Sequence, residues 1–261
     1  MLARKLGKKP AVLDSRTPRL APVLDAHLPE PPPSCDYGSR FAAWKLWRNG
    51  DQLSNHGQTI PGLGDCTAVS VASAIRVLTA SGAGGEIELS DDQVVGIYMA
   101  NGYDPSRPAT DQGAVEIDVL NRWCEAGYAT GRQAPDVLTG YGYVNPKSVD
   151  GVRRAIAMLG GLYVGLSLPD YALSEGDIWV APTRPYQIAG GHAVFLHGYD
   201  ADWLYLNSWG QRTRMDWGFF ATFCDEAYGL LSRDWLNVHG TSPMREDLDA
   251  LAEELRAARA P

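Results

Sequence analysis

The chain has 261 residues, of which 45% are apolar and 21% are charged, and its net charge at pH 7 is −8. This length provides for a sizeable core in one large domain or two small ones. The acidic balance argues against nucleic acid as the main partner, and no stretch approaches the roughly 20 apolar residues of a membrane span. We therefore expect a globular protein that binds neither nucleic acid nor membranes.

The first 35 residues differ in composition from the rest of the chain. They are basic up to Arg19 and then proline-rich in "LPEPPPS". Such a composition favours an extended chain without a core of its own. We predict an arm over 1–35 that lies on the domain or trails from it, with its basic residues in solvent. A loop rich in Gly, Asn and Pro is expected over 49–64.

Helices are predicted in the middle of the chain. Residues from Cys66 to about 78 are small or apolar on nearly every face, which is typical of a helix buried in the core. Ser90 and Gln93 form a capping box that begins a second helix, to about residue 100. Further helices are expected over 113–127 and over 148–159, the latter ending before two glycines.

After residue 160 the apolar residues recur with the period of a strand. Strands are expected over 162–168, 192–199, 203–207 and 218–224. Helices first and strands later indicate the α+β class with an antiparallel sheet. A short amphipathic helix is predicted over 241–261, with Leu248, Leu251 and Leu255 on one face.

The four cysteines, at positions 35, 66, 124 and 224, are widely spaced and form no C-x-x-C pair. That spacing fits neither a zinc site nor a dense disulfide framework. No apolar stretch follows the basic N-terminus, so the sequence shows no secretory signal. We expect a reducing, cytoplasmic environment.

Cys66 is the first candidate for chemistry. A thiol is a useful nucleophile only as thiolate, which the N-terminus of a helix and a nearby imidazolium both favour. His192 begins a predicted strand, and the next strand returns antiparallel to end at Asn207, whose amide can orient the imidazole. His197 lies an odd number of positions along that strand, so we expect it to face the other way as a packed or solvated histidine.

Three segments carry a resemblance to a known family: "GLGDCTAVS" around Cys66, "GGHAVFLHGYD" around His192, and "LNSWG" around Asn207. The order is Cys, His, Asn, and the separations are 192 − 66 = 126 and 207 − 66 = 141 residues. In these features the chain resembles the papain-like cysteine peptidases, and most of all an uncharacterised branch found in bacteria and their phages. The resemblance covers roughly residues 60–235.

The resemblance implies a papain-like domain over 36–240, with a helical half over about 60–160 and an antiparallel-sheet half over about 161–240. The arm 1–35 and the helix 241–261 flank that domain. The central buried helix would begin at the nucleophile.

The resemblance also implies roles for single residues. Cys66 would be the nucleophile that forms a thioester, His192 the base and then the acid, and Asn207 the residue that orients the imidazole. Trp209 would shield the His192–Asn207 hydrogen bond from water. No metal or organic cofactor is implied.

The sequence departs from the family pattern near the oxyanion hole, where the family has a glutamine six residues before the nucleophile. That position is Ile60, which cannot donate a hydrogen bond. Gln58, His56 or Asn55 could substitute as the donor, and of these we favour Gln58. Asp65, directly before the thiol, would oppose thiolate formation unless its carboxylate faces away.

Three functions remain open on the sequence alone. The first is a peptidase, or related thiol hydrolase, that cleaves peptide or isopeptide bonds of a peptide or protein substrate. The second is an acyl transferase that uses the same three residues. The third is a catalytically weak or inactive papain-like module, such as a component of a phage virion. The arm or the C-terminal helix would then contact another copy or a neighbouring subunit.

Overall fold

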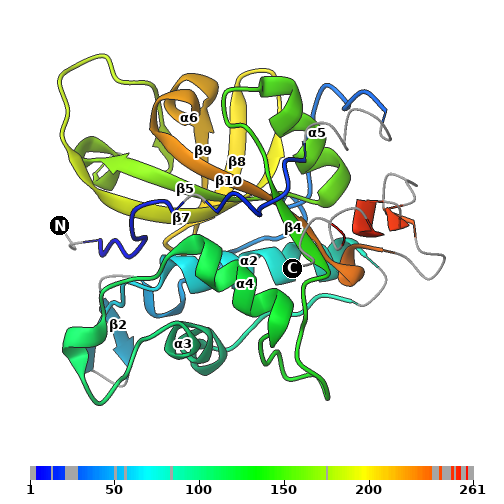
Figure 1. Ribbon diagram of the computed structural model, residues 1–261. Coiled ribbons are helices and arrows are strands. Elements are labelled where there is room, and N and C mark those ends of the chain that lie inside the picture. The colour runs from blue at the N-terminus through cyan, green and yellow to red at the C-terminus, as the bar shows by residue number, and fades with distance from the viewer. Residues whose placement is uncertain are drawn as a thin grey trace.

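The computed structural model describes residues 4–12, 14–20, 29–49, 52–55, 58–82, 85–174, 176–236, 241–242, 248–249, 251–253 and 257, with the backbone alone over 52–55 and 58–61. Some helices lie on one side of the molecule, and a large twisted sheet lies on the other with the remaining helices packed against it (Figure 1). The two sides meet along a boundary that the N-terminal segment crosses, drawn in dark blue. This is the α+β arrangement that the sequence predicts.

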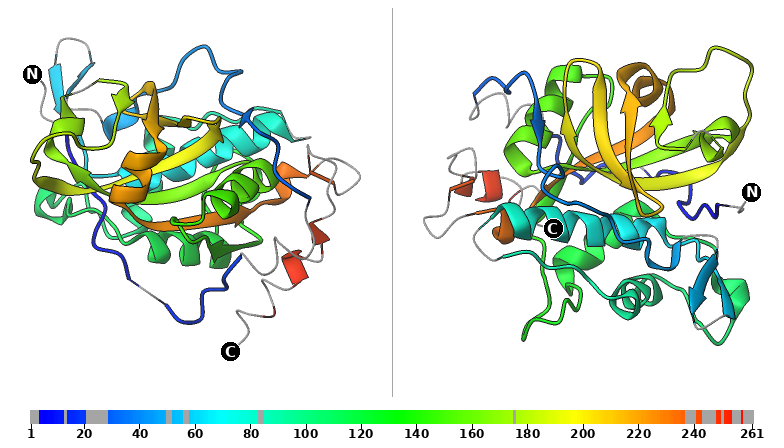
Figure 2. Two further views of the ribbon diagram at one scale, coloured as in Figure 1. Left: turned by 90° about the horizontal axis from the view of Figure 1, so that it is seen from above. Right: turned by 180° about the vertical axis from the view of Figure 1, so that it is seen from behind.

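Helix α2 (Cys66–Ser81) is the central helix of the molecule. Every residue from Cys66 to Thr79 is buried. The helix packs against both the sheet, through strand β7, and the other helices of its side (Figure 2). Its small side chains allow this close approach from several directions, as the sequence predicts. The N-terminus of the helix, with Cys66, therefore points at the boundary between the two sides.

The remaining helices of this side are shorter. Helix α3 (Asp91–Ala100) begins with the expected capping box of Ser90 and Gln93. Helix α4 (Glu116–Glu125) lies within the predicted range 113–127. The helical side also contains two 3-10 turns, η1 (Trp47–Asn49) and η2 (Pro108–Thr110).

Over the described residues, the main sheet has eight strands in the order β4-β10-β5-β7-β8-β9-β6, with β1 paired to β7. All pairs are antiparallel except β6 with β9. The strands are β1 (Cys35–Asp36), β4 (Gly140–Tyr143), β5 (Leu162–Pro169), β6 (Ile178–Trp179), β7 (Ile188–Tyr199), β8 (Trp203–Ser208), β9 (Gln211–Asp216) and β10 (Cys224–Leu231). Strands β5, β7 and β8 contain the three strands predicted over 162–207.

Helix α5 (Val149–Leu159) contacts β5, β7 and β10, and a left-handed Gly160 ends it. The 3-10 turns η3 (Asp170–Leu173) and η4 (Arg233–Trp235) connect the sheet to its surroundings. Among the described residues, no helix has the length and apolarity to cross a membrane.

The strand predicted over 218–224 is wrong, because this segment forms helix α6 (Trp217–Phe223). The side chain of Asp216 accepts a hydrogen bond from the backbone N–H of Phe219 and so caps the helix. Phe219, Phe220 and Phe223 are all buried, at a spacing that a helix places on one face. The sequence suggests a strand here because aromatic residues are common in strands, although the spacing of the three phenylalanines is that of a helix. The strand follows directly, as β10.

The loop predicted over 49–64 is also wrong in part. Residues 52–55 and 58–61 form the two antiparallel strands β2 (Gln52–Asn55) and β3 (Gln58–Pro61) of a separate small sheet. This pair was hidden because the polar segment has no apolar alternation.

At the C-terminal end, Leu248 and Leu251 are buried, as the predicted amphipathic helix requires. Residues 249, 251–253 and 257 are helical, whereas Leu255 lies outside the described residues. His197, expected to be either packed or solvated, is packed: its side chain is fully buried. Its ring stacks on Trp44, and Nδ1 lies 3.2 Å from Oδ1 of Asp36.

Candidate active site

Cys66 and the residue pair His192–Ala193 meet at the boundary between the two sides. The sulfur of Cys66 accepts a hydrogen bond of 3.4 Å from the backbone N–H of Ala193 in β7. Both Cys66 and His192 are almost completely buried, with exposed fractions of 2% and 1%. The fold therefore brings the predicted thiol and the predicted imidazole strand together.

The ring of His192 is hydrogen-bonded to Ser208 in the structure. Its Nε2 lies 2.9 Å from Oγ of Ser208. The amide of Asn207 donates instead to Oγ of Ser73, at 3.1 Å. Two buried atoms of this group, Nδ1 of His192 and Oδ1 of Asn207, have no hydrogen-bond partner among the described residues. The ring contact that the resemblance implies for Asn207 is thus made by Ser208 in this structure.

Trp209 covers one face of the imidazole. The two rings stack with centroids 4.4 Å apart, and the guanidinium of Arg4 lies 4.5 Å from the centre of the Trp209 ring. Trp209 has a φ of 47°, a conformation that non-glycine residues rarely adopt and that clusters at functional sites. Trp179 meets His192 edge to face. Aromatic rings therefore exclude water from His192.

An unexpected segment covers Cys66. Residues 4–9, the strap, cross the boundary between the two sides as an extended chain (Figure 1). The N–H of Lys8 donates to the carbonyl of Gly191 at 3.0 Å, and the N–H of Lys9 to that of Ala114 at 2.9 Å. The N–H of Ala114 in turn donates to the carbonyl of Gly7, at 2.9 Å. The strap is thus held on both sides in the manner of a β-strand.

Glycines make this close approach possible. A Cβ built on Gly113 or Gly191 would lie 1.9 Å from the carbonyl oxygen of Gly7 or 2.2 Å from that of Lys8. A Cβ on Gly7 itself would lie 1.8 Å from the carbonyl oxygen of Gly64. Real Cβ atoms do not approach backbone this closely, so the strap needs a glycine at each of these places.

The strap also corrects, for Lys8, the expectation that the basic residues of the arm lie in solvent, whereas Lys9 and Arg16 are exposed as expected. The side chain of Lys8 is 1% exposed. Lys5 pairs with Asp111, whose Oδ1 also accepts from the N–H of Gly64 at 2.9 Å. These contacts join residues that lie far apart in the chain, and no local pattern in the sequence reports them.

Burial under the strap sets the protonation states of the site. It raises the pKa of the Cys66 thiol to about 12, although the backbone N–H groups of Ala193 and Gly7 that point at the sulfur act in the opposite direction. It lowers the pKa of His192 to about 3, with a further contribution from the charge of Arg4. At neutral pH the covered site therefore contains a neutral thiol and a neutral imidazole.

Asp65 is a buried carboxyl at the start of α2. In the part of the chain that the structure describes, neither of its side-chain oxygens has a hydrogen-bond partner, and burial raises its pKa to about 8. Asp65, directly before the thiol, is thus largely uncharged at neutral pH. A neutral carboxyl does not oppose thiolate formation as the expected carboxylate would.

We predict that Asp65→Asn changes how stability depends on pH. The folded chain keeps a proton on Asp65 that the unfolded chain releases near pH 4, so the stability of the wild type decreases as pH rises from about 4 to about 8. The variant should lose part of this decrease and exceed the wild type in melting temperature at pH 8. Thermal unfolding between pH 4 and pH 8 measures it, and parallel curves for the two proteins would contradict the assignment.

No protein-family model matches the chain, and no curated protein matches its sequence. Solved structures do match. Xylellain, a cysteine protease from Xylella fastidiosa, aligns with a TM-score of 0.64 at 17% identity over 88% of this chain and 97% of its own. The chain has the papain-like fold.

Two further papain-like structures match across most of their length. The Carica candamarcensis cysteine protease CMS1MS2 aligns with a TM-score of 0.53 at 18% identity, over 77% of this chain and 99% of its own. Digestive procathepsin L 3 of Tenebrio molitor larval midgut aligns with a TM-score of 0.55 at 16% identity, over 88% of this chain and 76% of its own. Identities this low show the fold, so the activity has to be argued from the site.

Two residues of the candidate site are not indicated by the sequence. Ser208 stands in the quoted "LNSWG", directly after Asn207, and that adjacency was the available signal. Lys8 had none, because a lysine in a basic run is ordinarily solvated. The side chain of Gln58, the proposed oxyanion donor, lies outside the described residues.

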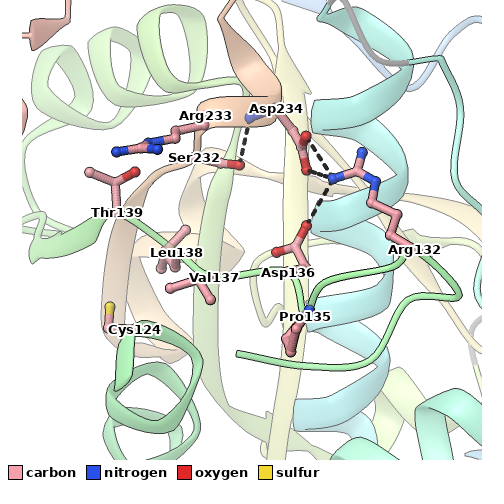
Figure 3. A pocket seen from close by; sticks show the side chains of 10 residues that line it. All are labelled: Cys124, Arg132, Pro135, Asp136, Val137, Leu138, Thr139, Ser232, Arg233 and Asp234. Carbon is pink, nitrogen blue, oxygen red and sulfur yellow. Dashed lines mark hydrogen bonds and ion pairs between the residues drawn. The ribbon is translucent and has the colours of Figure 1, made fainter. Parts of the chain in front are cut away.

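A separate surface cavity of about 560 Å³ opens beside Cys124, Leu138 and Asp234 (Figure 3). None of Cys66, His192 and Asn207 lines it. Arg132 lies 2.8 Å from Asp234 and 3.6 Å from Asp136, so the charges in this cavity neutralise one another. Its chemistry is that of an ion-pair network, and the proposed reactive groups lie elsewhere, under the strap.

Proposed function

We propose that this papain-like domain is a cysteine peptidase that cleaves peptide or isopeptide bonds, and that the strap holds it closed. One observation carries the proposal: an extended peptide is hydrogen-bonded on both sides directly over Cys66. The same backbone groups, on Ala114 and Gly191, are available to another extended chain when the strap leaves. Such a chain would lie against the thiol.

The chemistry proposed for the site is acyl transfer to water. Nδ1 of His192 takes the thiol proton, and the thiolate attacks the carbonyl carbon of the scissile bond. The imidazolium returns the proton to the leaving amine, which leaves a thioester on Cys66. Water, deprotonated by the same nitrogen, then releases the acid and restores the thiol.

Two side chains are proposed to hold the imidazole for these steps. Ser208 supports its own role through the 2.9 Å contact, since an Nε2–H that donates to Oγ leaves the lone pair on Nδ1 for the thiol proton. Asn207, the third member of the proposed catalytic triad, supports its role through a buried Oδ1 without a partner. If the Nε2–H turned from Ser208 to Asn207, that hydrogen bond would remove the cost of the burial.

The strap contacts support a closed, rather than a cleaved, state. The strap group directed at the sulfur is the N–H of Gly7, a hydrogen-bond donor and not an electrophile. The neutral thiol and imidazole also lack the ion pair that activates a nucleophile. This buried thiol is the observation that favours the alternative function, a catalytically inactive papain-like module.

Opening the strap separates the two candidates. We predict that the full-length Gly7→Ala variant hydrolyses members of a fluorescence-quenched peptide library, because its Cβ cannot fit beside Gly64. The matched control is Gly7→Ala with Cys66→Ala, which opens the site without the nucleophile and should be inactive. Mass spectrometry with added amine distinguishes hydrolysis from acyl transfer by the product. An opened site that reacts with neither water nor amine would favour the inactive module.

A further inference from the structure

Lys8 of the strap fills a pocket whose charged lining is acidic. Its ammonium lies 2.9 Å from Oδ1 of Asp225 and 2.9 Å from Oε1 of Glu226. Glu226 is fully buried, and its other oxygen accepts from the hydroxyl of Tyr228 at 2.9 Å. Asp225 is held in the same way by Oγ of Ser167, at 2.9 Å. Both carboxylates are thus fixed by the fold, independently of the strap.

A third carboxyl completes this carboxylate pocket. Glu116, at the start of α4, is fully buried, and no described residue forms a hydrogen bond with either of its oxygens. The carboxyl is therefore an unused acceptor; burial raises its pKa well above the usual value, and the charge of Lys8 acts in the opposite direction. Leaving such groups buried without a cation is unfavourable.

The floor of the pocket is shaped for a long side chain. A Cβ built on Gly165 would lie 2.1 Å from Cε of Lys8 and 2.7 Å from Cγ of Glu226. Any other residue at 165 would block the alkyl chain before its ammonium reached the carboxylates. The pocket therefore combines room for an alkyl chain with negative charge at its end.

We propose that the carboxylate pocket, formed by Glu116, Asp225 and Glu226 over Gly165, is a subsite that takes the lysine or arginine side chain of an extended peptide ligand. This deepens the proposed function, on which it rests: for the peptidase, the ligand is a substrate with a basic residue at this position. The strap already binds as such a ligand would. Its backbone is hydrogen-bonded to Ala114 and Gly191, and its Lys8 side chain lies in the pocket.

Binding tests the pocket without catalysis. The protein is the full-length Gly7→Ala, Cys66→Ala chain, and the probe is a fluorescent peptide with the sequence of residues 4–12. We expect Lys8→Met in the probe to weaken binding about 30-fold or more, as truncation of a buried charge pair does. Lys8→Arg should bind within a few-fold. The matched control is Lys9→Met, which removes the same charge from an exposed neighbour and should have little effect.

A variant of the pocket gives the reciprocal test. Glu226→Gln in the protein should reduce the preference for lysine over methionine at position 8 of the probe, since it removes the buried charge that faces the ammonium. Equal binding of the unaltered probe and the Lys8→Met probe would overturn the proposal, as would equal losses for Lys8→Met and Lys9→Met. Far-ultraviolet circular dichroism establishes that each protein is folded.

Hydrolysis by the Gly7→Ala chain then distinguishes the two proposals. Cleavage of library peptides with a basic residue at this position, over those with leucine or glutamate, supports both. Cleavage that favours leucine overturns the carboxylate pocket and leaves the peptidase. Selective binding of the unaltered probe without any hydrolysis supports the pocket as a ligand site and overturns the peptidase.

Discussion

The Gly7→Ala variant is expected to react with iodoacetamide at Cys66 on the order of 100-fold faster than the wild type. The strap is held by three backbone hydrogen bonds of 2.9–3.0 Å to Ala114 and Gly191. At a net value of about 1 kcal/mol each, their loss changes the open fraction by roughly 10²-fold. The Cβ of the alanine, 1.8 Å from a backbone oxygen, makes their loss unavoidable.

Protonation acts in the same direction. Under the strap the pKa of Cys66 is raised to about 12 by burial, so almost no thiolate exists at pH 7. When the strap leaves and water reaches the site, the pKa of Cys66 should fall and the pKa of the His192 imidazole should rise. Labelling of the variant should therefore persist to lower pH than that of an ordinary thiol.

Peptide mass spectrometry assigns the label to Cys66 among the four cysteines. Gly96→Ala is the matched control, because a Cβ on Gly96 meets nothing within 4 Å. Equal labelling rates for Gly7→Ala and the wild type would show that the strap does not control access to the thiol.

His192→Ala, introduced into the opened Gly7→Ala chain, is expected to lower kcat/KM by about 10³-fold. The imidazole is proposed to act twice, on the thiol proton and on the leaving amine, and general acid–base groups contribute typically 10²–10⁴-fold. The variant should also lose rapid alkylation below pH 7, because no imidazolium remains to stabilise the thiolate. Activity equal to that of the opened parent would remove His192 from the mechanism.

Ser208→Ala and Asn207→Ala in the same opened chain measure how the imidazole is held. Each should lower kcat about tenfold with little change in KM, because both act through the ring and not on substrate. Each should also displace the pH profile of kcat, which loss of packing alone does not do. A loss confined to Ser208→Ala would assign the orienting role to the serine, and a loss confined to Asn207→Ala would assign it to the asparagine.

The sequence predicts the central part of this fold well, for local reasons. Helix α2 begins at Cys66 as predicted, because glycines and an aspartate precede a long run of small apolar residues. Strand β7 contains the alternating segment that starts at His192. In each case the information lies within about a dozen residues, which is the range over which periodicity and capping act.

The parts that escaped prediction depend on distant contacts. The strap is invisible in the sequence because its residues find their partners at positions 114, 191, 225 and 226. Helix α6 was misassigned because its aromatic residues suit either secondary structure, and the cap at Asp216 decides the matter. In the covered state the ring of His192 contacts Ser208, the residue directly after the predicted Asn207. A difference of this size depends on side-chain rotamers, which no pattern of residue types specifies.

Because the strap belongs to the same chain as the site that it covers, its occupancy does not depend on protein concentration. A tethered segment acts at an effective concentration in the millimolar range when its connection is short and flexible. Dilution will therefore not open the protein, and a peptide offered at micromolar concentration competes at a disadvantage of about a thousandfold. A screen of the wild type with ordinary substrates would score it as inactive, whatever the opened site can do.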